Sequence, residues 1–113
     1  MITKTPKPPY YAVIFSSIRT SGDNGYAQMA AEMEKLVETQ PGFLGYESAR
    51  SETGITISYW KDLESVKNWK ENKIHTIARN KGREVWYSKF MVRIAKVESE
   101  YGFEKENLRN QES

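Results

Sequence analysis

The chain has 113 residues, of which 38% are hydrophobic and 28% are charged, with no cysteine and one histidine. This length fits one domain, and without cysteine the chain can form neither disulfides nor a cysteine-ligated zinc site. Seventeen basic against fifteen acidic residues leave a formal charge of +2, which is too small to favour nucleic acid as a partner.

The histidine count and the lengths of the apolar segments indicate which metal sites, membrane spans and targeting signals the chain could have. One histidine per chain cannot build a multi-histidine metal site without symmetry, so we expect no metal. No segment approaches the roughly 18–20 consecutive apolar residues of a membrane span. The apolar patch at residues 10–15 is also shorter than the core of a secretory signal peptide, which runs about 7–15 residues. We therefore expect a cytoplasmic protein that has neither nucleic acid nor a membrane as its partner.

The first third of the chain predicts an arm, a strand and a helix. Residues 1–9 contain three of the four prolines, and since proline disfavours helix, they should form an extended N-terminal arm. Residues 10–19 are rich in β-branched and aromatic side chains, which predict a strand. Residues 26–37 place apolar side chains at the spacing of an amphipathic helix, which Pro41 and Gly42 end.

The middle of the chain predicts a β-hairpin followed by helix. Residues 43–51 and 55–61 have strand composition and flank a short turn that contains glycine. Asp62 is a good N-cap for a helix over 63–72. A second helical stretch follows, with Gly82 as its expected end. The sequence leaves open whether these two stretches form one kinked helix or two.

The last part of the chain predicts a long strand over residues 85–97 and an acidic, polar tail over 98–113. The resulting order, β-α-β-β-α-β, is that of the ferredoxin-like fold. We therefore predict an α+β domain over residues 10–97, in which the helices cover one face of an antiparallel sheet. The handedness of crossover connections leaves few other arrangements.

Both long predicted strands are apolar on their two faces, although a sheet with helices on one face should alternate. The first strand places Tyr11, Val13 and Phe15 on one face, and Ala12, Ile14 and Ile18 on the other. Because a large exposed apolar face is unusual on a monomer, we predict that a second copy covers it and forms a homodimer. The alternative is that the tail or the proline-containing arm folds back over this face.

Several residues are candidates for a functional site. His75 is the only side chain that titrates near neutrality without a shift, and it is either an ordinary helical histidine or a base at a pocket edge. Trp69 lies in the same helical region and suits either the core or an aromatic ligand. Arg50 and Arg93 are cations on strands that favour burial, where they could hold an anionic substrate or reach solvent. Ser17 interrupts an apolar strand, where its hydroxyl could line a pocket or bond the backbone.

Residues 40–46 read QPGFLGY, and residues 58–69 read SYWKDLESVKNW, with His75 following. Together these segments resemble the antibiotic biosynthesis monooxygenase family. The resemblance covers roughly residues 10–97. It implies a dimeric α+β barrel, in which two ferredoxin-like sheets pack face to face, with a pocket between sheet and helices in each subunit.

The resemblance also implies an activity. Members of the family include oxygenases that form quinones without metal or flavin, because the deprotonated substrate itself supplies electrons to O₂. The helical tryptophan of the family falls on Trp69 and its motif histidine on His75. We therefore expect a cofactor-independent monooxygenase on a small aromatic, quinol-like substrate. His75 would assist proton transfer, Trp69 would contact the substrate, and Tyr46, Arg93 and Ser17 would be further binding residues.

Two alternatives remain at this point. The same dimeric pocket could hold a small molecule without turnover, as a binding module. The haem-degrading branch of the family uses an asparagine late in its first strand and a histidine about ten residues after the helical tryptophan. This chain has Ser16 and Ser17 in that strand and Arg79 ten residues after Trp69, so the resemblance argues against haem degradation.

Overall fold

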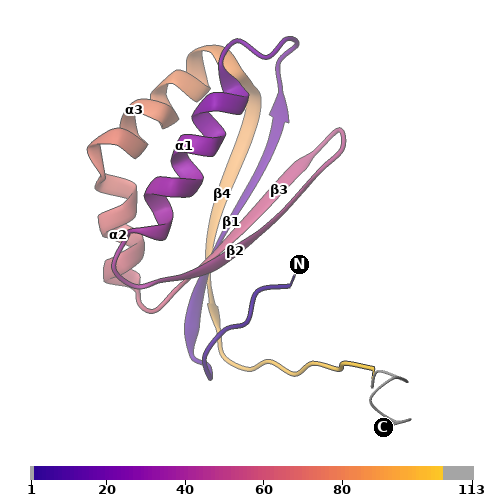
Figure 1. Cartoon of the computed structure of the whole chain (residues 1–113), viewed down its shortest axis with the longest axis vertical. Coiled ribbons are helices and arrows are strands. Elements are labelled where there is room, and N and C mark those ends of the chain that lie inside the picture. Colours follow the sequence, from indigo (N-terminus) through magenta and orange to yellow (C-terminus); the bar gives the residue numbers. More distant parts are fainter. Residues whose placement is uncertain (1, 106–113) are drawn as a thin grey trace, which may run out of the picture.

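Three helices and a π-helical turn lie on one face of a four-stranded antiparallel sheet in the computed structural model, which describes residues 2–105 (Figure 1). The elements are β1 (Tyr10–Arg19), α1 (Tyr26–Glu38), β2 (Phe43–Arg50), β3 (Gly54–Trp60), α2 (Leu63–Glu71), α3 (Lys73–Lys81), the π-helical turn η1 (Gly82–Trp86) and β4 (Tyr87–Val97). The strand order β2-β3-β1-β4 is that of the predicted ferredoxin-like α+β fold, which is confirmed.

The two C-terminal helical stretches are separate helices. The carboxylate of Asp62 accepts a hydrogen bond from the backbone N–H of Ser65 at 2.8 Å, so it caps α2 as predicted. Asn72 leaves the helical region with ψ 128° and ends α2. Its side-chain oxygen then accepts from the backbone N–H groups of Ile74 and His75, at 3.0 and 3.1 Å. Asn72 therefore breaks one helix and starts the next.

α3 ends at Lys81 with Gly82 as its C-cap, as predicted, but the chain does not pass directly into the last strand. The chain continues through Gly82 as the wide turn η1, and β4 begins at Tyr87, two residues later than expected. The reason is Trp86, whose buried indole donates a hydrogen bond to the backbone carbonyl of Asn24 at 2.8 Å. The backbone carbonyl of Trp86 also accepts from the N–H of Thr20 at 3.0 Å. These contacts hold Trp86 inside before the chain enters the sheet.

The packed core lies at one end of the sheet, where α1 ends and α2 begins. Trp60 is fully buried there between Val37 of α1 and Val66 of α2. Toward the other end of β3 the strand positions that face the helices are small or polar: Ser48, Gly54, Thr56 and Ser58. Because such side chains cannot fill the space below the helices, this half of the interface is hollow.

The N-terminal arm covers part of the sheet face opposite the helices. The backbone N–H of Thr3 donates to the Glu47 carboxylate at 3.0 Å, and its hydroxyl donates to the Tyr46 carbonyl at 2.8 Å. Thr5 donates to the hydroxyl of Tyr10 at 3.0 Å, and Tyr10 is buried. The arm therefore folds back over one end of this face, as the alternative to the homodimer allowed.

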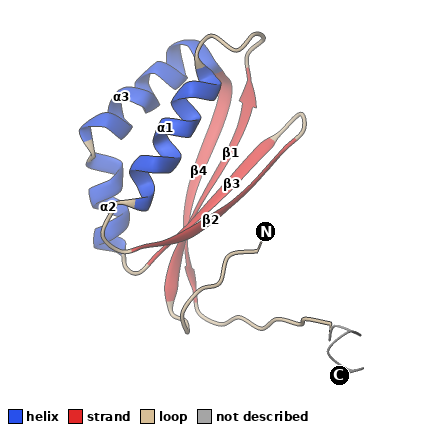
Figure 2. Cartoon of the chain, in the orientation of Figure 1, coloured by secondary structure: helices blue, strands red, loops and turns tan. Residues whose placement is uncertain are grey.

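The rest of this outer face is left uncovered by residues 2–105 (Figure 2). Ile14 pairs with Ile57 on it, and Ile18, further along β1, is 43% exposed. Tyr101 and Phe103 in the tail are exposed and do not pack on the sheet. The rest of the predicted tail, residues 106–113, lies outside the described residues.

Candidate active site

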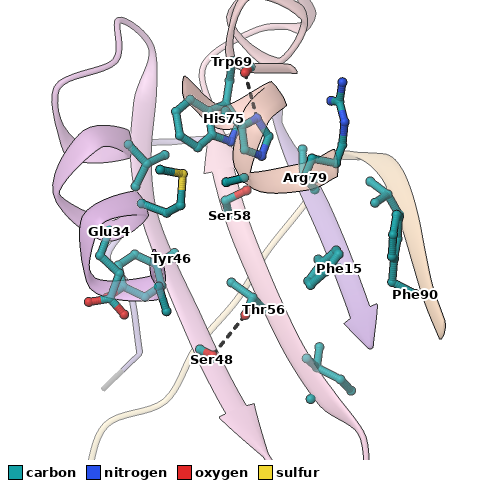
Figure 3. A pocket seen from close by; sticks show the side chains of 18 of the residues that line it. Phe15, Glu34, Tyr46, Ser48, Thr56, Ser58, Trp69, His75, Arg79 and Phe90 are labelled. Carbon is teal, nitrogen blue, oxygen red and sulfur yellow. Dashed lines mark hydrogen bonds between the residues drawn. The ribbon is translucent and has the colours of Figure 1, made fainter. Parts of the chain in front are cut away.

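A cavity of about 680 Å³ lies between the helices and the sheet, in the hollow half of their interface (Figure 3). Residues of all four strands and of α1, α2, α3 and η1 line it. Its volume is in the range of pockets that hold small organic molecules. Val13, Phe15 and Phe43 make part of its wall apolar, whereas Ser48 and Thr56 place hydroxyl groups on its floor, joined by a hydrogen bond of 3.0 Å.

Trp69 and His75 meet at one end of this cavity. Their rings stack with a centroid separation of 4.1 Å and an interplanar angle of 9°. Two residues six positions apart in one continuous helix would lie roughly 120° apart around its axis. The break at Asn72 removes this separation and lets the imidazole lie over the indole. The structure therefore brings together the two residues that the sequence placed in one helical region.

A hydrogen bond orients the His75 ring. Its Nδ1 lies 2.9 Å from the backbone carbonyl oxygen of Trp69. Since a carbonyl can only accept, Nδ1 carries the hydrogen, and in the neutral ring Nε2 keeps the lone pair. Nε2 lies on the side of the ring turned toward the cavity and Ser58 (Figure 3). His75 thus presents a proton-accepting nitrogen to whatever occupies the cavity.

The surroundings keep this imidazole neutral. Burial lowers the pKa of His75 below its usual value, and the positive charge of Arg79 lowers it further. The hydrogen bond to the Trp69 carbonyl acts in the opposite direction but is outweighed. At neutral pH the ring is therefore ready to accept a proton.

Tyr46 lines the cavity from β2, beside the carboxylate of Glu34 on α1 (Figure 3). Burial raises the pKa of the Tyr46 hydroxyl, and the negative charge and hydrogen bond of Glu34 raise it further. The phenol therefore keeps its proton at neutral pH and donates it in the hydrogen bond to Glu34. This placement agrees with the expectation that Tyr46 faces the pocket.

The other two expected binding residues do not line the cavity. Ser17 is only 2% exposed, and its hydroxyl accepts a hydrogen bond from the guanidinium of Arg50. Arg93 pairs with Ile14 in the register of β4 and β1, which places it on the outer face of the sheet. The structure therefore does not bring Arg93 to the cavity, because alternation along β4 turns it the other way.

Sequence reasoning missed most of the charged residues of the site. Four cationic side chains line the cavity, from Arg50, Lys70, Arg79 and Arg83, and Glu34 is the one carboxylate among its described lining residues. The signal for two of them was present, since Arg79 and Arg83 follow His75 at steps of four residues, the spacing of one helical face. Arg50 was identified as a strand cation, but not its partners.

Three further observations concern the described part of the chain. Among residues 2–105, no three His, Asp or Glu side chains gather where they could hold one metal ion. None of the helices there is long and apolar enough to cross a bilayer. The Nε of Arg79 is buried without a hydrogen-bond partner, while its Nη1 donates to the Lys70 carbonyl at 3.1 Å.

Comparison with known proteins gives a family, a relative and structural neighbours. Residues 9–81 match the family model of antibiotic biosynthesis monooxygenase. The uncharacterized protein YqjZ of Bacillus subtilis is 47% identical over 105 residues, which cover 91% of this chain and 92% of that protein. Rv0793 of Mycobacterium tuberculosis has a TM-score of 0.71 at 11% identity, covering 82% of this chain and 99% of that one. SnoaB, a cofactor-independent oxygenase from Streptomyces nogalater, has a TM-score of 0.68 at 11% identity, covering 78% and 92%.

Proposed function

Because the chain belongs to the antibiotic biosynthesis monooxygenase family, we propose that it is a cofactor-independent monooxygenase acting on a small aromatic, quinol-like substrate. The observation that carries the proposal is the cavity-facing Nε2 of a neutral His75, held in place by the indole and the carbonyl of Trp69. The description of SnoaB as a cofactor-independent oxygenase supports the same class of reaction.

His75 acts as the proton acceptor. An acidic C–H or phenolic O–H of the substrate loses its proton to Nε2, and the anion that results is electron-rich enough to react with O₂. Trp69 is a positioning residue, because one face of its indole is covered by the imidazole at 4.1 Å. Tyr46 lines the cavity as a binding residue, and its one hydroxyl hydrogen is held by the Glu34 carboxylate.

The reaction balances with an anthrone as the model substrate. The ring CH₂ group gives one proton to His75, and the carbanion transfers one electron to O₂ and recombines with it, which forms a C–O bond. The peroxide takes the proton back from His75 and loses water, leaving a C=O group. One oxygen atom of O₂ enters the product and the other leaves in water, and the carbon has supplied all four electrons.

We further propose that the working form is a homodimer. The uncovered part of the outer face carries Ile14, Ile18 and Ile57, and 43% of Ile18 is exposed in one copy. A second sheet packed on this face would remove these side chains from water. Light scattering coupled to size exclusion should give twice the chain mass at micromolar concentration, and a monomer would contradict the proposal.

The function is tested by oxidation of dithranol, an anthrone without a carboxylate, followed by the absorbance of the quinone product in air and under argon. Wild-type protein should accelerate the reaction in air over buffer and have no effect under argon. His75→Gln should lower kcat by roughly 10²-fold or more, since a positioned base contributes about that factor. Lys73→Gln, on the exposed surface of α3, is the matched control and should behave as wild type.

Two results would overturn the proposal. One is the absence of acceleration with dithranol and with a set of neutral hydroquinones. The other is turnover that His75→Gln leaves unchanged. Retention of an aromatic ligand without any turnover would instead favour a binding module built on the same cavity.

A further inference from the structure

We propose that the ligand of this cavity is an anion, an aromatic molecule whose carboxylate is held by Arg50 and Arg83 at the end of the cavity away from His75. The proposal rests on the proposed function only for the reaction at the other end of the ligand. Binding of the anionic group is a separate property, and it can be measured without turnover.

The charge of the lining is the first observation. The chain as a whole is nearly balanced, with a formal charge of +2. The cavity is not, because four cationic side chains and one carboxylate are found among its described lining residues. The carboxylate, Glu34, lies beside the Tyr46 hydroxyl on the α1 side. A partly open cavity with this excess of positive charge favours an anion over a neutral molecule.

The setting of Arg50 is the second observation. Its guanidinium lies across Gly54, the neighbouring residue on β3, and donates to the hydroxyl of Ser17 on β1. A Cβ on Gly54 would lie 2.5 Å from the Arg50 Nε and closer still to the rest of the guanidinium. The missing side chain of Gly54 therefore makes the groove in which the arginine lies. Ser17 is an uncharged partner, so the positive charge of Arg50 stays available, as do the N–H groups not used by Ser17.

Arg83 approaches the same place from the helix side. It belongs to η1 and lines the cavity, and its Cζ lies 5.6 Å from the centre of the Phe90 ring. Phe90 pairs with Ser17, which pairs with Gly54, so these residues form one rung across the sheet with Arg50 at its far end. The two arginines thus approach this rung from opposite sides.

Aromatic rings line the wall beside this rung. Phe15 lies 5.4 Å from Tyr87 and 5.5 Å from Phe90, measured between ring centres. Burial raises the pKa of the Tyr87 hydroxyl, so it stays protonated and adds no negative charge. A flat aromatic ligand could pack its ring against these walls and place its carboxylate between the two guanidiniums.

The distance between the two ends sets the shape of the ligand. His75 stacks on Trp69, which in turn packs 6.1 Å from Trp60 at the end of β3. The Nε2 of His75 is turned toward Ser58 (Figure 3), and Gly54 lies four positions from Ser58 along β3, which is roughly 13 Å of strand. A ligand that reaches from Nε2 to the arginines is therefore elongated, with its acidic group and its carboxylate at opposite ends.

The test compares 6-hydroxy-2-naphthoate with its methyl ester, which has the same rings and no charge. Binding is measured by quenching of tryptophan fluorescence. Wild-type protein should bind the acid at least roughly tenfold more tightly than the ester, because the acid gains charge-assisted hydrogen bonds. Arg50→Gln and Arg83→Gln should each weaken binding of the acid by roughly 3- to 10-fold and leave the ester within twofold, and the double variant should show no preference. Lys67→Gln, on the exposed side of α2 and outside the cavity lining, removes one positive charge as the control and should keep the preference.

Every outcome bears on the proposal. Equal affinity for acid and ester, no binding of either, or loss of preference in Lys67→Gln would each overturn it, the last because net charge alone would then be the cause. A clear preference without turnover of any substrate would keep the anion site and remove the proposed function. Turnover of dithranol without any preference for the acid would keep the proposed function and remove the anion site.

Discussion

Replacing Gly54 with alanine should reduce the carboxylate preference without unfolding the protein. The added Cβ would lie 2.5 Å from the Arg50 Nε, whereas ordinary contacts begin near about 3.4 Å. The guanidinium must therefore move by roughly 1 Å or more and leave its groove, and it loses its hydrogen bond to Ser17. A displacement of the guanidinium by this distance is enough to break its hydrogen bond to the ligand carboxylate.

The effect on stability should be small, because opposing terms nearly cancel. Alanine is favoured over glycine inside a strand by roughly 0.5–1 kcal/mol. The buried Ser17 hydroxyl loses one donor, at a cost of about 1 kcal/mol. The overlap falls on an exposed, flexible side chain that can swing into solvent. The free energy of unfolding should therefore change by no more than about 1 kcal/mol.

The assay is the same pair of fluorescence titrations together with urea unfolding. Gly54→Ala should weaken binding of 6-hydroxy-2-naphthoate about as much as Arg50→Gln does and leave its methyl ester unaffected. Full carboxylate preference in Gly54→Ala would refute the groove as the feature that holds Arg50. A loss of more than about 2 kcal/mol of stability would refute the assignment of the overlap to a movable side chain.

Three further predictions concern the framework of the site. In an NMR titration the pKa of His75 should lie below the ordinary value of 6.5. The unfolded chain then binds the proton at a higher pH than the folded protein, so the free energy of unfolding should fall as the pH drops below about 6.5. Denaturant unfolding at pH 7.5 and 5.5 should show a smaller fall in His75→Gln than in the wild type. Gly42→Ala should cost about 2–3 kcal/mol in urea unfolding, because Gly42 has φ 82° and its new Cβ would lie 2.6 Å from the Cβ of Ser65; a loss under 1 kcal/mol would contradict this. Asn72→Ala should cost about 1 kcal/mol in the same assay and lower kcat more than the control Lys73→Gln, since the cap holds the His75 backbone; an unchanged kcat would argue against positioning through this cap.

The order and type of the elements were predictable because they depend on local patterns. Apolar spacing over residues 26–37, the Asp62 cap and the composition of the strands each agree with the structure. The exception is the π-helical turn η1, which follows the end of α3 at Gly82 and delays the start of β4 to Tyr87. That turn depends on the burial of Trp86 and its hydrogen bond to Asn24, 62 positions away, and no local pattern reports such a contact.

The site was predictable only in part, because side-chain direction depends on register. The stacking of His75 on Trp69 needs the break at Asn72, and the sequence left open whether a break exists there. Arg93 was chosen by its charge and its strand, but a period of two places it on the outer face, opposite Ile14. Arg83 was missed, although it lies on the helical face of His75.

The most direct test of the central claim is oxidation of dithranol under ¹⁸O₂, with mass analysis of the quinone. The account predicts one ¹⁸O atom in each product molecule, and a rate that falls by roughly 10²-fold or more in His75→Gln while Lys73→Gln keeps it. Product without ¹⁸O, or the same rate of labelling in His75→Gln as in wild type, would contradict it.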